Sequence, residues 1–132
     1  MSGLREIRMS TPVRVSLIGA PTDIGAGHRG ASMGPEALRV AGIATALRAR
    51  GIDVLDRGNL AGPVNPWQPP SEGYRHLPEV VTWTRSVMHA VKAELDAGRL
   101  PVMLGGDHCL AIGSITAVAR HCQERGKDLR IL

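Results

Sequence analysis

The stretch Val102-Met-Leu-Gly-Gly-Asp-His-Cys-Leu-Ala-Ile-Gly-Ser-Ile115 decides the fold. The apolar run that follows Pro101 has the length and composition of a strand buried on both faces. Gly105 and Gly106 allow a sharp turn of the backbone, and apolar residues at helical spacing follow His108. The stretch therefore predicts a strand, a turn and a helix, with an acid and an imidazole at the corner. In parallel α/β sheets such corners lie at the carboxyl edge of the sheet, where ligands bind.

Strands and helices alternate along the rest of the chain. Strands are predicted at residues 13–18, 52–56, 100–104 and 128–132, and helices at residues 35–50, 78–97 and 109–125. A long, proline-rich loop is predicted at residues 57–77, and loops of this length are commonly functional or mobile. The alternation predicts a parallel sheet with right-handed crossovers. Because the last predicted strand coincides with the end of the sequence, we expect the N-terminal part of a longer domain, with residues 1–12 as a disordered terminus.

Composition and charge exclude several classes of partner. The 132-residue chain is 43% hydrophobic, which is typical of a globular protein, and it is long enough to bury a core. Its formal net charge is +4, but the basic residues are scattered and no aromatic residues interleave with them, so we expect no nucleic-acid partner. No apolar run is long enough to span a bilayer, and the N-terminus lacks the apolar core of a secretory signal. We therefore expect no membrane partner either.

Two cysteines bear on the cellular compartment. Cys109 and Cys122 lie on one predicted helix, where their separation along the sequence corresponds to about 20 Å. A disulfide requires Cα atoms within about 7 Å of each other, so the two cannot form one. Free cysteines favour a reducing, cytoplasmic location.

The glycine-rich residues 25–30, Gly-Ala-Gly-His-Arg-Gly, match the pattern of dinucleotide-binding loops, and Asp56 lies where an acid would bind a ribose. In that motif the first glycine directly follows a strand and the third lies at the start of a helix. Here intervening residues separate the strand from the first glycine and the last glycine from the predicted helix. A pyrophosphate would then miss the helix N-terminus. A non-catalytic nucleotide-binding α/β module nevertheless remains an alternative.

Asp107 and His108 have side chains of the kinds found at metal sites. Histidine is a common ligand for borderline metals, and an adjacent acid can orient its ring. One histidine does not make a metal site, and from spacing alone a packed or surface histidine is an equal alternative. His28 also follows a predicted strand and could face the same sheet edge. The other histidines lie in a predicted loop or within predicted helices (His76, His89 and His121).

Two parts of the chain together resemble a known family. Residues 19–21, 25–31 and 33–39 resemble the opening of arginases. Residues 105–114, which begin Gly-Gly-Asp-His, resemble the first metal-binding signature of the arginase/agmatinase (ureohydrolase) family. The order and separation of the segments also fit, and the resemblance covers residues 13–132. It implies a three-layer α/β/α fold with a mainly parallel sheet, truncated in this chain after the fourth strand.

The resemblance implies that the full-length protein hydrolyses the guanidinium group of L-arginine to L-ornithine and urea. It implies two Mn²⁺ ions at the carboxyl edge of the sheet, one of them bound by His108. Four further residues are candidates for the surroundings of the metals or for a loop that borders the site: Asp107, Gly106, His28 and Arg29. Agmatinase is the alternative within the family, but the early first strand and the glycine loop favour arginase. Family members are commonly trimers or hexamers, so we expect a homo-oligomer.

The chain departs from the family mainly by what it lacks. The family's Asp-x-His-x-Asp cluster, a later aspartate pair and the proton-shuttling histidine fall beyond Leu132, so we expect no catalytic residue within the chain and no activity for it alone. Cys109 replaces a more usual serine, which we expect to be tolerated, and His28 stands where arginases often carry a second arginine. Strands of the C-terminal half separate the third and fourth strands in the family, so residues 129–132 are predicted to have no strand partner.

Overall fold

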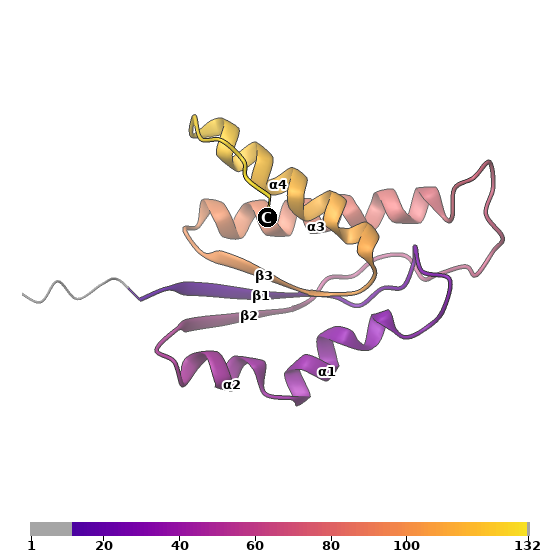
Figure 1. The fold of residues 1–132 in the computed structure, drawn as a ribbon. Coiled ribbons are helices and arrows are strands. Elements are labelled where there is room, and N and C mark those ends of the chain that lie inside the picture. Colours follow the sequence, from indigo (N-terminus) through magenta and orange to yellow (C-terminus); the bar gives the residue numbers. More distant parts are fainter. Residues whose placement is uncertain (1–11, 132) are drawn as a thin grey trace, which may run out of the picture.

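The structure, a computed structural model, describes residues 12–131 and contains a parallel sheet of three strands in the order β2-β1-β3. In chain order its elements are β1 (Arg14–Ala20), η1 (Ala31–Met33), α1 (Gly34–Val40), α2 (Ile43–Arg48), β2 (Asp53–Asn59), α3 (Leu77–Asp96), β3 (Leu100–Gly105), η2 (His108–Leu110) and α4 (Ala111–Glu124). Helices α1 and α2 cover one face of the sheet, and α3 and α4 cover the other (Figure 1). The predicted three-layer α/β/α architecture is thereby confirmed.

β1 is the central strand of the sheet, and nearly all of its side chains are buried. Alternate residues of a strand face opposite sides of the sheet, and β1 uses both sides. Ile18 and Ala20 belong to the core beneath α3 and α4, whereas Leu17 belongs to a second core that includes Leu47 of α2. The two cores hold the helical layers on the two faces of the sheet.

A buried polar network locks the amino end of the sheet. The Arg99 Nε donates to the Ser16 hydroxyl at 2.8 Å, and that hydroxyl donates to Glu94 at the end of α3 at 2.6 Å. Arg99 also donates to the Val15 carbonyl at 2.6 Å, and Arg57 pairs with Glu94 at 2.7 Å. Burying such groups is costly unless each has a partner, and here each has one. The connecting loops that carry the candidate site residues lie at the opposite, carboxyl end of the strands.

The helix predicted at residues 35–50 is two helices, so the prediction of one helix is wrong. α1 ends at Val40, and Gly42 adopts a φ of 84° before α2 begins at Ile43. Glycine reaches this left-handed conformation without the penalty that a Cβ would bring, and it commonly ends helices. β2 also runs further than predicted, to Asn59, with a shift of register opposite residues 17–19 of β1. The other elements differ from prediction by a few residues at their ends.

The predicted fourth strand is also wrong within the described residues. Residues 127–131 form neither helix nor strand, and Leu132 lies outside the described part of the chain. The segment turns back along α4 (Figure 1), where Leu129 and Ile131 line a hollow together with Met103 of β3 and Ile115 of α4. The prediction that these residues lack a strand partner agrees with the three-stranded sheet. The predicted disordered terminus, residues 1–12, lies almost entirely outside the described residues.

Candidate metal centre

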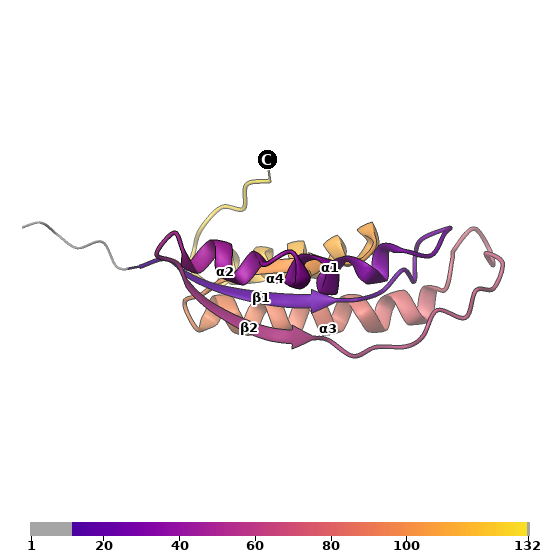
Figure 2. The same ribbon diagram turned by 90° about the horizontal axis from the view of Figure 1, so that it is seen from below.

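Three loops meet at the carboxyl end of the sheet. The loop after β1, the loop between β2 and α3, and the turn between β3 and α4 all lie at this end in both views (Figures 1 and 2). Gly106 brings the third loop against the first, because a Cβ on Gly106 would lie 2.5 Å from the Ala20 carbonyl oxygen and 2.7 Å from that of Thr22. No other residue type fits there without moving the backbone, which explains the second glycine of the turn.

Asp107 fastens this corner to the glycine loop. One carboxylate oxygen accepts from the Gly25 amide at 2.7 Å, and the other accepts from the Cys109 amide at 2.9 Å. The Asp107 amide in turn donates to the Thr22 carbonyl at 3.1 Å. Both oxygens therefore hold backbone groups, and the second bond caps the first turn after the strand. In this structure Asp107 orients the corner that carries His108.

His108 is exposed and begins η2. It lines a hollow of about 250 Å³ with Met103, Gly106 and Ser114 among its neighbours. Within residues 12–131, no three His, Cys, Asp or Glu side chains gather closely enough to hold a metal ion. The donor set present therefore fits one position of a metal site and not a whole site.

His28 and Arg29 lie apart from this corner. Both are exposed on the loop after β1, and neither lines the hollow beside His108. The Arg29 guanidinium instead lies over the Trp67 ring, 5.1 Å from its centroid. Their predicted place around the metals stays a prediction, but Arg29 has a different neighbourhood from the one that the sequence suggested.

The contacts between the first two loops were not foreseen from the sequence. Asp23 is buried and accepts from the Gly30 amide at 3.3 Å and the Ser32 hydroxyl at 3.2 Å. Asn65 of the second loop donates to the Asp23 carbonyl at 2.8 Å. The buried His76 has its Nδ1 2.8 Å from the Ile24 carbonyl, to which it donates. The only sequence signal for these contacts is that the two loops together contain acidic, amide and imidazole side chains.

The thiol beside the histidine lies in a setting that disfavours its thiolate form. Burial raises the pKa of the Cys109 thiol to about 12, and the neighbouring Asp107 carboxylate adds to the rise. Only the thiolate is nucleophilic, so at pH 8 we expect iodoacetamide to modify Cys109 at least about a hundredfold more slowly in the folded chain than in the urea-unfolded chain. Mass spectrometry of peptides, with a chelator present, measures both rates. Equal rates in the two states would contradict this expectation.

Both cysteines are free, as predicted.

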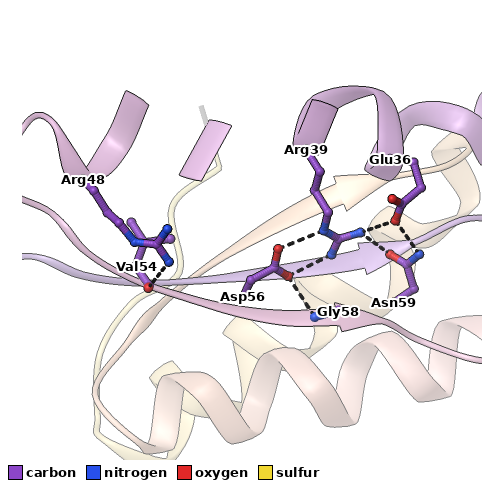
Figure 3. Close-up of polar contacts among 7 residues, drawn as sticks. All are labelled: Glu36, Arg39, Arg48, Val54, Asp56, Gly58 and Asn59. Atoms are coloured by element: carbon purple, nitrogen blue, oxygen red, sulfur yellow. Dashed lines mark hydrogen bonds and ion pairs between the residues drawn. The ribbon is translucent and has the colours of Figure 1, made fainter. Parts of the chain in front are cut away.

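Asp56, the candidate ribose-binding acid, is already hydrogen-bonded within the chain. Arg39 of α1 donates to both of its carboxylate oxygens at 2.9 Å, and Glu36 and Asn59 complete the cluster (Figure 3). The Gly25 amide of the glycine loop is likewise taken by Asp107. These contacts use the groups that a dinucleotide would need, so the geometry does not favour the nucleotide-binding alternative.

The Arg39–Asp56 pair leads to a prediction about acid stability. The hydrogen bond from Arg39 lowers the pKa of Asp56 below its usual 3.8. The folded state therefore binds fewer protons, and the stabilisation is complete above pH 4 and is lost as the pH falls through the lowered pKa. We expect Asp56→Asn to cost about 1 kcal/mol at pH 7 and to flatten the loss of stability below pH 4. Urea unfolding at several pH values measures this, with the exposed Asp128→Asn as control. An unchanged acid dependence in Asp56→Asn would contradict the assignment.

The fold and the corner define the class of the chain. It is a parallel α/β protein with an exposed histidine on a glycine-built turn at the carboxyl edge of its sheet. The model of the arginase family matches residues 13–132, and the chain belongs to that family. The family resemblance found in the sequence is thereby confirmed.

Individual relatives agree with this assignment. The arginase of Brevibacillus brevis is 38% identical over 112 residues, a match that covers 85% of this chain and 38% of that protein. The arginase of Brucella melitensis is 38% identical over 117 residues, covering 88% of this chain and 38% of that protein. Among solved structures, the arginase of Bacillus caldovelox superposes with a TM-score of 0.76 at 34% identity, covering 83% of this chain and 37% of that one. The chain thus spans less than two fifths of the length of these relatives. Within residues 12–131, no helix has the length and apolar character needed to cross a bilayer.

Proposed function

We propose that residues 1–132 form the N-terminal part of a single arginase-like domain, and that the whole protein hydrolyses L-arginine to L-ornithine and urea. The observation that carries this proposal is the exposed His108 on the corner between β3 and α4. Asp107 fixes that corner to the loop after β1 through the Gly25 amide at 2.7 Å. Membership of the arginase family supports the same activity.

We further propose that His108 is one ligand of a pair of Mn²⁺ ions. An imidazole suits such an ion in a site otherwise rich in oxygen ligands. When bound, a metal pair would make hydroxide available near neutral pH and would stabilise charge that develops at the guanidinium group. Gly106 and Asp107 position His108 and would not bind the metals themselves. The glycine permits the close turn, and the Asp107 carboxylate fixes the orientation of that turn.

Several properties of the whole protein remain proposals with it. We propose a cytoplasmic homo-oligomer, either a trimer or a hexamer, with a small guanidino substrate and neither nucleic acid nor membrane as partner. The 132-residue chain alone is proposed to be inactive, since the remaining ligands would come from the part of the relatives that this chain does not span. Agmatine in place of arginine is the alternative substrate.

The test compares substrates and chain lengths. The gene product that includes any residues encoded after Leu132 is incubated with L-arginine or with agmatine, with Mn²⁺ or with a chelator, and urea is measured. We expect urea from arginine only in the presence of Mn²⁺, and none from the 132-residue chain. Urea from agmatine alone would support the agmatinase alternative and contradict the arginase proposal. Urea formation that survives the chelator would contradict the metal assignment.

A further inference from the structure

A second cavity shares no lining residue with the hollow beside His108. Its volume is about 600 Å³, against about 250 Å³ beside His108, and it lies between the loop after β1 and the residues that follow β2. Small-molecule sites typically have volumes of about 300 to 1,000 Å³ and combine apolar walls with a few polar groups. This cavity has that size and that mixture. Gly106, Asp107 and His108 do not line it, whereas Arg29, also a candidate from the sequence, does.

The apolar wall contains both tryptophans of the chain. Trp83 on α3 is buried and donates its indole N–H to the Pro63 carbonyl at 2.9 Å. Trp67 is partly exposed and has a φ of 53°, a left-handed conformation that is uncommon outside glycine. The Asn65 side chain holds it there by accepting from the Trp67 amide at 2.9 Å. Backbone strain of this kind costs about 1–3 kcal/mol and is concentrated at functional sites.

The charge available in the cavity is positive. Arg29 lies over the Trp67 ring and is exposed, and no carboxylate among the described residues forms an ion pair with it. The one carboxylate in the wall, Asp23, is buried, and its oxygens accept from Gly30 and Ser32 of its own loop and from Asn65. A guanidinium over an indole is attracted to the face of the ring, and its N–H groups can still bind a carboxylate in the bidentate manner.

From this arrangement we propose that the cavity is a second binding site, specific for a small organic carboxylate with an apolar body. The carboxylate binds the Arg29 guanidinium, and the apolar body packs between the Trp67 and Trp83 rings. This site is separate from the proposed metal centre and does not depend on the arginase activity. The two share only the glycine loop, in which Gly25 contacts Asp107 while Arg29 and Gly30 line the cavity.

The test uses cyclohexanecarboxylate as the probe and the fluorescence of the two tryptophans as the signal. These are the only tryptophans of the 132-residue chain, and both line the cavity. We expect a saturable change with cyclohexanecarboxylate. Cyclohexanecarboxamide lacks the charge and acetate lacks the apolar body, so each is expected to bind at least about tenfold more weakly. His108→Ala is expected to leave the titration unchanged, which separates this site from the metal centre.

Variants test the role of the guanidinium. Arg29→Gln is expected to weaken binding of the probe at least about tenfold, with Arg29→Lys intermediate, because lysine keeps the charge but loses the planar pair of donors. Arg120→Gln, which changes an exposed arginine on α4, is the matched control and should bind as the parent does. Circular dichroism checks that each variant is folded. Equal binding of the acid and its amide, unchanged binding by folded Arg29→Gln, or no saturable change in the folded parent chain would each overturn the proposal.

Discussion

Replacing His108 by alanine in the full-length gene product is expected to remove bound manganese and to lower arginine hydrolysis at least about a hundredfold. Loss of residues that merely orient a metal ligand costs about ten- to a hundredfold, and loss of the ligand itself should cost no less. The exposed ring contributes little to the fold, so the melting temperature in the presence of a chelator should stay within about 2 °C of the parent value. Metal content after gel filtration and urea formation are the two measurements.

His89→Ala is the matched control for this experiment. His89 is likewise exposed, but it lies on α3, away from the carboxyl-edge loops. Its removal should change neither metal content nor activity, which excludes a general effect of removing an imidazole. If His108→Ala retained the metal and the activity of the parent, the corner would not be a metal site, and the proposed function would lose its main support.

The fold was predictable because its signals are local. The apolar run at residues 102–104, the two glycines and the helical pattern that follows predict a strand-turn-helix unit without any distant contact. The break between α1 and α2 was not predictable in this way, because the apolar stripe continues across Gly42 and only its positive φ ends the first helix. The strand predicted at residues 128–132 failed for a related reason. Alternation gives a segment the propensity of a strand, but a strand also needs a neighbour, and residues 127–131 pair with neither edge strand of the sheet, β2 or β3.

The site was predictable in position but not in its connections. The sequence placed Asp107 and His108 at the carboxyl edge, and the structure has both there. The bond between Asp107 and Gly25 joins residues far apart in the sequence, as does the contact of Asn65 with Asp23. Contacts of this kind depend on how the loops pack, for which no spacing rule exists. The same applies to Arg29, whose stacking on Trp67 could not be read from the glycine motif.

Gly106→Ala tests whether the geometry of the corner, rather than the histidine alone, makes the site. The added Cβ would lie 2.5 Å from the Ala20 carbonyl oxygen and 2.7 Å from the Leu110 Cδ1 atom. The end of the Leu110 side chain can shift, but the Ala20 carbonyl and that of Thr22, 2.7 Å from the added Cβ, belong to the backbone and cannot yield without moving the turn. We expect the 132-residue chain to lose about 1–3 kcal/mol of unfolding free energy, as measured by urea denaturation. In the full-length protein, the displaced His108 should lose metal affinity as well.

Gly105→Ala is the control that makes this prediction sharp, because it adds the same methyl group one residue earlier. A Cβ at Gly105 would meet no atom within 4 Å, and its φ lies outside the left-handed range. Its unfolding free energy should therefore stay within about 0.5 kcal/mol of the parent. A large difference between the two variants would show that the close contact of the turn with β1 positions His108. Equal stability and equal metal content in both would mean that the turn tolerates displacement, and the role assigned to Gly106 would then be wrong even if His108 proved essential.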